Sequence, residues 1–327
     1  MTDLEMLIAA SCAAVVIFLI DFISLLIAYI SYRMIFRRKR QSYDPYFGLE
    51  GEKYEPYRDK LSEVIEGISK EDFEMLYITA RDGTRLAARY YERVPGAPLH
   101  MIFHGYKSSL LRDGSGGGCD SRKMGHNLLL VYQRAHGESG GSTITFGIRE
   151  RYDVVDWVNY MTAKLGERQE IILIGTSMGA ASVLMASELG LLKTVKCIIA
   201  DSPYTSPKQV IMNSVRAMGY PSLLSPFIAL GARIFGGFSI CEASTTEAVR
   251  HSDKPILIAH GESDSIVPVE MAREIAASAR EAGRDVTLMT FKGAEHCMSF
   301  IVDYEGYTEK RNEFLSRHLK SFKKSEE

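Results

Sequence analysis

A serine between two glycines is the feature of this 327-residue chain with the clearest chemical meaning. Residues 175–179 read Gly-Thr-Ser-Met-Gly, between the apolar run 170–174 and the small, apolar run 180–186. This order predicts a strand, a sharp turn and a helix, with Ser177 at the top of the turn. A hydroxyl held on such a turn stands clear of the backbone. Ser177 is therefore a candidate nucleophile.

A serine hydroxyl is a weak nucleophile at neutral pH, so it needs a base and a carboxylate that orients the base. His296 lies in a loop after the strand expected over 285–291, and Asp264 lies in the turn after the preceding strand. Strands of a parallel sheet bring such turns to one edge. We expect Ser177, Asp264 and His296 to meet there as nucleophile, orienting acid and base. Asp201 also ends an expected strand and is the alternative orienting acid.

Acyl transfer also needs N–H donors for the negative oxygen of the tetrahedral intermediate. Met178 follows the nucleophile, so its backbone N–H is expected to be one donor. We assign the second to the backbone N–H of Tyr106, in the loop after the strand expected over 99–103. The phenol of Tyr106 either lines the pocket or adds another contact.

With these residues in place, the chain resembles the α/β-hydrolase superfamily, and in particular its bacterial, membrane-anchored branch of esterase, lipase or serine aminopeptidase-like proteins. The resemblance runs from about Glu74 to Leu319. It implies that Arg134 and His136 support a turn and are not catalytic. The matching segments are His104–Tyr106, Gln133–Ser139, Gly175–Gly179, Asp201–Pro203, Gly261–Pro268 and Gly293–His296.

The fold class that we expect is α/β, with a mainly parallel sheet and helices on both faces, as in the α/β-hydrolase fold. Alternating strand and helix patterns over 72–327 support this class. Asp82-Gly83 predicts a hairpin at its start. An insertion over about 203–253 is expected to form a helical cap over the catalytic edge. Its apolar side chains either bind a hydrophobic acyl or aromatic group or only pack onto the sheet.

The amino-terminal part, 1–40, is expected to be a transmembrane anchor with a basic cytoplasmic flank. Residues 7–30 are almost all apolar, and about 36 Å of helix is enough to cross a hydrocarbon core of roughly 30 Å. Basic residues cluster after this run, which predicts that the hydrolase lies on the cytoplasmic side. Asp21 inside the run is either tolerated or functional. Residues 41–71 are expected to be a juxtamembrane linker and a short helix.

Composition argues against several other classes of protein. The net charge of −2, with its only dense basic run beside the apolar segment, speaks against nucleic-acid binding. The eight histidines show no metal-ligand spacing, so neither a metal nor another cofactor is expected. An odd number of scattered cysteines favours neither disulfides nor zinc. They are Cys12, Cys119, Cys197, Cys241 and Cys297.

The function expected from the sequence is that of a membrane-anchored serine hydrolase that cleaves carboxylic esters or thioesters through an acyl-enzyme on Ser177. Its partners would be a small-molecule or lipid-like acyl substrate and the membrane. An aminopeptidase-type amide hydrolase is the alternative enzyme, and it would need an acidic anchor for a peptide amine. A membrane-tethered binding module without catalysis is the remaining alternative.

Overall fold

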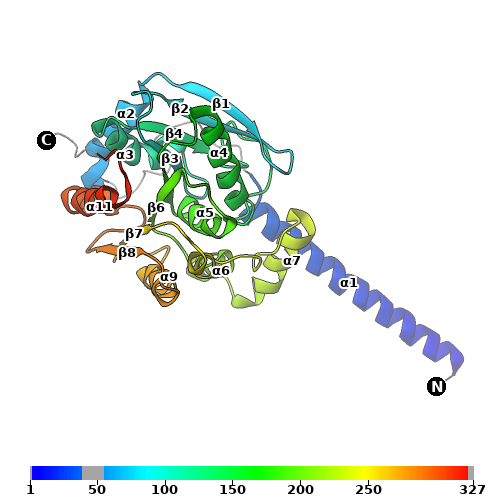
Figure 1. Ribbon diagram of the computed structural model, residues 1–327. Helices are drawn as coiled ribbons and strands as arrows, with labels where there is room; N and C mark the ends of the chain where they lie inside the picture. Colours follow the sequence, from blue (N-terminus) through cyan, green and yellow to red (C-terminus); the bar gives the residue numbers. More distant parts are fainter. Residues whose placement is uncertain (1, 39–54, 323–327) are drawn as a thin grey trace.

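A computed structural model describes residues 2–38 and 55–322 of the chain. Its centre is an eight-stranded sheet with the strand order β1-β2-β4-β3-β5-β6-β7-β8, and every pairing from β4 to β8 is parallel (Figure 1). The strands are β1 (Glu74–Thr79), β2 (Arg85–Tyr91), β3 (Leu99–Phe103), β4 (Asn127–Tyr132), β5 (Ile171–Thr176), β6 (Val195–Asp201), β7 (Ile256–Gly261) and β8 (Val286–Phe291). Buried strands β3 to β7 are almost continuously apolar, as expected for a parallel sheet covered on both faces.

Helices cover both faces of the sheet, which confirms the expected α/β-hydrolase class. One face carries α2 (Arg58–Ser69), α3 (Leu110–Lys123), α10 (Ser299–Val302) and α11 (Tyr304–His318). The other face carries α4 (Glu150–Leu165), α5 (Met178–Ala186), α8 (Thr245–Arg250) and α9 (Val269–Glu281). Short 3-10 turns, η1 (Glu55–Tyr57) and η2 (Ser187–Leu189), flank α2 and α5.

The predicted hairpin at Asp82-Gly83 joins β1 to β2. Ala80 donates its backbone N–H to Thr84 O, and Gly83 has a φ of 82° that favours glycine. Arg134 lies beneath this turn and forms ion pairs with Asp82 and with the buried Asp153. Arg134 therefore supports the hairpin, as the sequence resemblance implied.

Helix α4 begins at Glu150, directly after a turn. Gly147 has a φ of 93° and Phe146 a φ of 54°, so both belong to a turn. The carboxylate of Glu150 accepts the backbone N–H groups of Thr145 and Gly147. These bonds stabilise the turn in place of another helical turn.

The segment between β6 and β7 forms a helical cap at the carboxyl edge of the sheet. It contains α6 (Pro207–Ala217), η3 (Ser222–Leu224) and α7 (Ser225–Gly236), followed by α8. Ser206 caps α6 by accepting the N–H of Gln209, and Gly237, at a φ of 67°, ends α7. Buried apolar side chains of the cap and of the end of the amino-terminal helix pack together with those of α5, the helix that follows Ser177.

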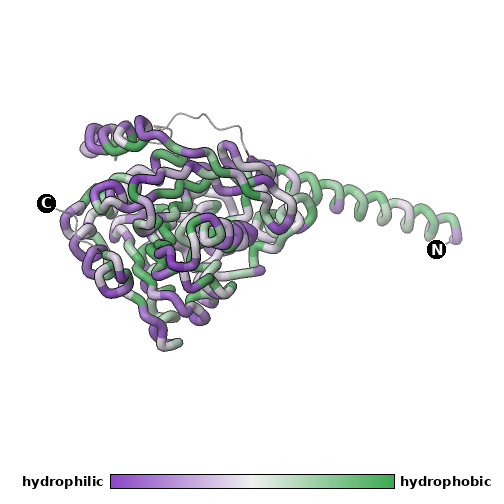
Figure 2. Tube along the Cα trace, turned by 45° about the horizontal axis from the view of Figure 1, so that its top comes forward, coloured by the Kyte–Doolittle hydropathy of each residue, from purple (hydrophilic) through white to green (hydrophobic). Residues whose placement is uncertain are grey.

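The amino-terminal helix α1 (Asp3–Ile35) has two different parts. Its first part stands away from the body with exposed apolar side chains (Figures 1 and 2). Its last turns pack against α7: Ala28, Tyr32 and the following Phe36 are buried, and a Cβ on Gly231 would collide with the carbonyl of Ala28. Among the described residues, α1 is the helix that is long and apolar enough to cross a membrane.

The end of α1 departs from the simple anchor-and-linker expectation. Arg38, expected in the basic membrane flank, donates its guanidinium to the carbonyls of Gly137 and Ser139. Its backbone N–H also binds Ser142 O, so α1 is fastened to the body before the linker begins. The remainder of that flank, 39–40, and the first part of the segment expected over 41–71, up to residue 54, lie outside the described residues.

Candidate active site

Ser177 lies on a strained turn between β5 and α5, as predicted. Its φ of 53° and ψ of −111° are unusual for a residue with a side chain. A Cβ on Gly175 would collide with Gly179, and a Cβ on Gly179 would collide with the carbonyl of Phe103. Only glycine at both positions lets strand and helix approach closely enough to hold the hydroxyl at the sheet edge.

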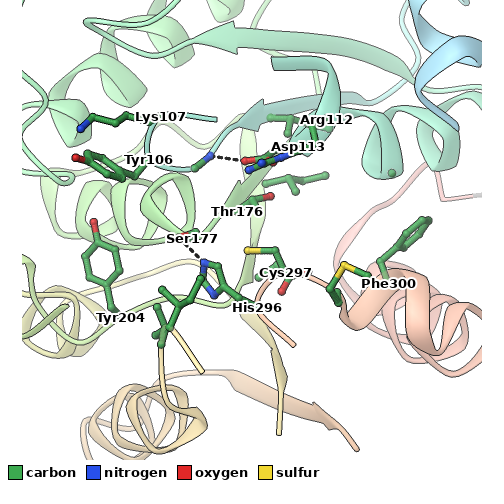
Figure 3. A pocket seen from close by; sticks show the side chains of 18 of the residues that line it. Tyr106, Lys107, Arg112, Asp113, Thr176, Ser177, Tyr204, His296, Cys297 and Phe300 are labelled. Atoms are coloured by element: carbon green, nitrogen blue, oxygen red, sulfur yellow. Dashed lines mark hydrogen bonds and ion pairs between the residues drawn. The ribbon is translucent and has the colours of Figure 1, made fainter. Parts of the chain in front are cut away.

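The structure brings Ser177, His296 and Asp264 together in one hydrogen-bonded row. Nε2 of His296 lies 2.9 Å from Oγ of Ser177 (Figure 3). Nδ1 of the same ring lies 2.7 Å from Oδ2 of Asp264. An Nδ1–H that donates to the carboxylate leaves Nε2 free to accept the serine proton. The three side chains are therefore arranged for nucleophilic attack with general-base assistance.

Asp264 is held as a carboxylate by its surroundings. Its other oxygen, Oδ1, accepts the backbone N–H groups of Ile266 and Val267, at 3.0 and 2.8 Å. Burial favours the neutral acid, but contacts from His260 and His296 outweigh it and hold the pKa of Asp264 below its usual range. Sequence reasoning missed His260; its place at the end of β7, four residues before Asp264, was the available signal.

Asp201, the alternative orienting acid, takes no part in this row. Its carboxylate accepts the hydroxyl of Ser202, and His296 faces Asp264 instead. Burial raises the pKa of Asp201 to about 6. An acid that is easily protonated near neutral pH is poorly suited to stabilise an imidazolium.

The loop that carries Tyr106, one of the two expected oxyanion donors, is held from two sides. Gly105 donates its N–H to the buried Asp113 at 2.7 Å, and Lys107 donates its N–H to Nε2 of His136 at 3.0 Å. Among the hydrogen bonds of the described residues, none uses the backbone N–H of Tyr106 or Met178, so both remain available to an oxyanion. The role of Asp113 in holding this loop was not predicted from the sequence, because its contact with Gly105 joins a helix to a loop eight residues earlier.

The same loop is bonded to the end of α1. The hydroxyl of Tyr106 donates to Ile35 O at 2.6 Å, and Nζ of Lys107 donates to Met34 O at 3.0 Å. These carbonyls have no partner inside the helix, so a hydroxyl and a cation at the helix end satisfy them. The Tyr106 phenol thus lines the pocket, as one of the two expected roles had it, and also binds the amino-terminal helix.

A cavity of about 600 Å3 opens beside Ser177 and His296. In Figure 3, Tyr106 and Tyr204 lie on one side of these two residues, and Cys297 and Phe300 lie on the other. We call the first side the cap arm; its apolar lining is Met34 and Ile35 of α1, Val210, Ile211 and Val215 of α6, and Met218 directly after α6. We call the second side the α3 arm; its lining includes Ile102, Ile174, Ile199, Gly116, Gly117 and Phe300.

Known proteins resemble this chain to different degrees. Over 194 residues, 59% of the chain is 28% identical to the uncharacterized protein YqkD of Bacillus subtilis. The aligned part spans 63% of that relative, which is less than two thirds of its length. The YfhR protein of Escherichia coli K12 is 22% identical over 239 residues, which are 69% of this chain and 74% of YfhR.

A family profile gives a firmer assignment. Residues 145–322, just over half of the chain, match the prolyl oligopeptidase family. The chain belongs to this family. In this member of the prolyl oligopeptidase family, the matched region contains Ser177, Asp264 and His296, while β1 to β4 and the amino-terminal helix lie before it.

Solved structures agree with the α/β-hydrolase fold of this prolyl oligopeptidase family member. An esterase of Pyrococcus furiosus is 24% identical with a TM-score of 0.62, covering 80% of this chain and 93% of its own. Est1E of Butyrivibrio proteoclasticus, solved with ferulic acid, is 20% identical with a TM-score of 0.55 and covers 74% and 98%. Dipeptidyl peptidase 4 of Porphyromonas gingivalis is 17% identical with a TM-score of 0.55 and covers 76% and 36%.

Proposed function

We propose that this protein is a membrane-anchored serine hydrolase that cleaves carboxylic esters or thioesters through an acyl-enzyme on Ser177. The observation that carries the proposal is the row of hydrogen bonds from Ser177 through His296 to Asp264. Membership of the prolyl oligopeptidase family supports the same chemistry.

The proposed reaction follows from the geometry of that row. Nε2 of His296 takes the proton of Ser177 as Oγ attacks the carbonyl carbon, and the backbone N–H groups of Met178 and Tyr106 receive the oxyanion. The imidazolium then gives its proton to the departing alcohol or thiol. Water, deprotonated by His296, releases the acid and restores the serine.

The charges around the cavity favour esters over peptides with a free amine. Three carboxylates line it: Asp113 lies against Arg112, and Asp120 lies against Arg311. Burial raises the pKa of Asp201 to about 6, and this carboxylate accepts the hydroxyl of Ser202. Two of the three lining carboxylates among the described residues are thus neutralised by arginines, and the buried Asp201 is the one that an ammonium group would have to use. An aminopeptidase-type activity remains the alternative, and it is an outcome of the experiment below.

Membrane anchoring is proposed from the exposed, apolar first part of α1. Transfer of α1 into the membrane gains about 0.5 kcal/mol for each large apolar residue, whereas a central Asp such as Asp21 costs about 3 kcal/mol. The summed gain exceeds this cost, so insertion is favourable. Because Met34 and Ile35 line the cavity, a membrane-embedded α1 would place the cap arm close to the membrane surface. Two apolar residues of the cap are also exposed there: Leu223, just before α7, and Ile234, within α7.

Covalent labelling tests the catalytic part of the proposal. A fluorophosphonate probe should label the full chain in detergent, and Ser177→Ala should abolish labelling and lower ester turnover by about 10^4-fold or more. The matched control is Ser265→Ala, an exposed serine whose hydroxyl binds Glu295, which should label normally. Folded protein that takes no label at Ser177 would favour a binding module. Faster turnover of aminoacyl anilides than of p-nitrophenyl esters would favour the peptidase.

Protease protection tests the anchoring part. Intact spheroplasts should shield the hydrolase from added protease, and inverted membrane vesicles should expose it, if the domain faces the cytoplasm. Release of the chain from membranes by carbonate would overturn the anchor, and digestion in intact spheroplasts would reverse the orientation.

A further inference from the structure

The α3 arm of the cavity ends in polar groups that the proposed acyl transfer does not use. They are His100 on β3, Asp120 on α3 and Arg311 on α11, which are only 1%, 3% and 4% exposed. Each belongs to the cavity lining, together with the apolar side chains between them and Ser177. A buried polar end on an otherwise apolar arm needs a physical reason, because burying polar groups costs free energy unless they are hydrogen-bonded.

Glycines make room for this arm between the sheet and α3. Side chains alternate along a strand, so His100 and Ile102 point to the same face of the sheet. Gly116 and Gly117 of α3 line the space opposite; a Cβ on Gly117 would lie 2.7 Å from Ile102, and one on Gly116 would lie 3.2 Å from Phe300. Larger residues at these positions would narrow the arm, so the glycine-rich sequence of α3 keeps it open.

Three atoms at the closed end lack a hydrogen-bond partner among the described residues. They are Oδ1 of Asp120, Nδ1 of His100 and Nη1 of Arg311, the last of which has only its ion pair with Asp120. Nε2 of His100 is already engaged with His126 at 3.0 Å. The other carboxylate oxygen of Asp120 contacts Arg311, so the charges of this pair balance. A ligand group at this end should therefore be neutral and able to bond to the carboxylate and the imidazole.

A hydroxyl is the smallest neutral group that fits these requirements. It can donate its proton to Oδ1 of Asp120 and still accept or donate at Nδ1 of His100, whichever tautomer the imidazole takes. A carboxylate would add a negative charge beside Asp120 with Arg311 already paired. A methyl group would leave both polar atoms unbonded.

The fold also sets the length of the chain that would reach this end. His100 is in register with Ile172, five residues before Ser177, which is about 16 Å along the strand at ~3.3 Å per residue. Asp120 lies seven residues beyond Asp113 on α3, or about 10 Å at ~1.5 Å per residue. The polar end is thus roughly 10 to 16 Å from the reacting carbonyl.

We propose that the α3 arm binds the acyl chain of the substrate and that this chain carries a hydroxyl at its far end, recognised by Asp120 and His100. The proposal rests on the serine hydrolase function above. The acyl group stays on Ser177 after the first step while the alcohol must leave, so the closed arm suits the acyl group. The cap arm, where Met218 is 71% exposed, suits the leaving group.

Matched substrates test this on the full chain. Esters of octanoate, decanoate and dodecanoate are compared with their ω-hydroxy counterparts, with acetate as the reference. We expect kcat/KM to favour an ω-hydroxy ester by about 10- to 100-fold at the best length, as for a hydrogen bond to a charged group. Equal or slower turnover of every ω-hydroxy ester would overturn the proposal. Loss of activity on all esters, acetate included, would instead contradict the proposed function.

Variants locate the effect in the α3 arm. The double variant Asp120→Leu/Arg311→Leu replaces a buried ion pair by apolar groups, an exchange that proteins often tolerate, and should make the plain ester the better substrate. Should that variant fail to fold, Gly116→Leu provides the second test, with kcat/KM for dodecanoate falling at least 10-fold more than for acetate. The control Gly118→Ala adds a methyl near Ile68 and Leu128, outside the cavity, and should keep the ratio of wild type. An unchanged ratio in Gly116→Leu would place the acyl chain elsewhere.

Discussion

The two arms of the cavity are built from opposite kinds of surface. The cap arm has an apolar lining from α6 and the end of α1, close to exposed parts of the molecule. The α3 arm is enclosed by the sheet and a glycine-rich helix, and its end is polar. The row from Ser177 to Asp264, which lies between them, has its hydrogen bonds complete within the chain. The difference indicates that residues at the edge of the sheet determine the reaction, whereas the lining of each arm determines separately which substrate group it accepts.

Loss of a residue of the row from Ser177 to Asp264 should lower kcat by the same factor for every ester, whichever groups occupy the two arms. Asp264→Asn should lower kcat by about 10^4-fold for every ester, because an amide at this place favours the wrong tautomer of His296. The preference for one acyl chain over another should stay as in wild type. Steady-state kinetics over the ester series measures both quantities.

The control for this change is Asp201→Asn, which should lower kcat by less than about 10-fold, since Asp201 does not contact His296. A loss in Asp201→Asn as large as in Asp264→Asn would make Asp201 the orienting acid after all. A change in acyl preference in Asp264→Asn would mean that chemistry and selectivity are not separable.

The catalytic edge was accessible from sequence because its residues occupy special local positions. Ser177 needs a positive φ between glycines, and Asp264 and His296 each follow an apolar strand, so turn chemistry and strand order were enough to bring them together. The sheet, the hairpin at Asp82-Gly83 and the cap followed from the same signals of periodicity and turn residues.

The two arms were not accessible in the same way, because they depend on packing between distant segments. Nothing local in the glycine-rich run 115–118 indicated a cavity, whereas the structure shows that Gly116 and Gly117 border one, near Phe300 and Ile102. Likewise, the apolar run of α1 predicted an anchor, but nothing local showed that Met34 and Ile35 would form a wall of the cavity. The start of α4 has a local cause that periodicity does not reveal: the carboxylate of Glu150 binds the preceding turn.

The cap arm can be disturbed without touching the α3 arm. Gly231→Ala places a methyl group against the carbonyl of Ala28, a backbone atom that moves only if α1 shifts away from α7. Displacing Met34 and Ile35 would remove roughly 1 kcal/mol of apolar contact, so KM should rise about 3- to 10-fold for esters of long alcohols and less for methyl esters. The control is Arg233→Ala, an exposed residue on α7. If the rise in KM depended on the length of the acyl chain and not on that of the alcohol, the assignment of the two arms would be reversed.

The last prediction concerns acid and the buried imidazoles at the end of the α3 arm. Burial lowers the pKa of His126, the partner of His100, to about 4. As pH falls below about 6.5, the unfolded chain takes up a proton that folded His126 refuses until about pH 4, so stability falls by about 1.4 kcal/mol per unit across this window.

His126→Asn keeps a hydrogen-bonding side chain beside His100 but cannot titrate, so its thermal midpoint should fall less steeply than that of wild type between pH 6.5 and 4. Thermal unfolding of the full chain in detergent, followed by tryptophan fluorescence, measures the slope through Trp157, which is fully buried. His104 and His136 remain unaltered in both proteins, so their titration cancels in the comparison, whereas that of His100, whose partner is replaced, contributes to the difference. The control His251→Ala changes an exposed histidine on the helix end of α8 and should leave the slope as in wild type. Parallel slopes in wild type and His126→Asn would mean that water already solvates the end of the α3 arm, and a hydrated end would have little need of a substrate hydroxyl.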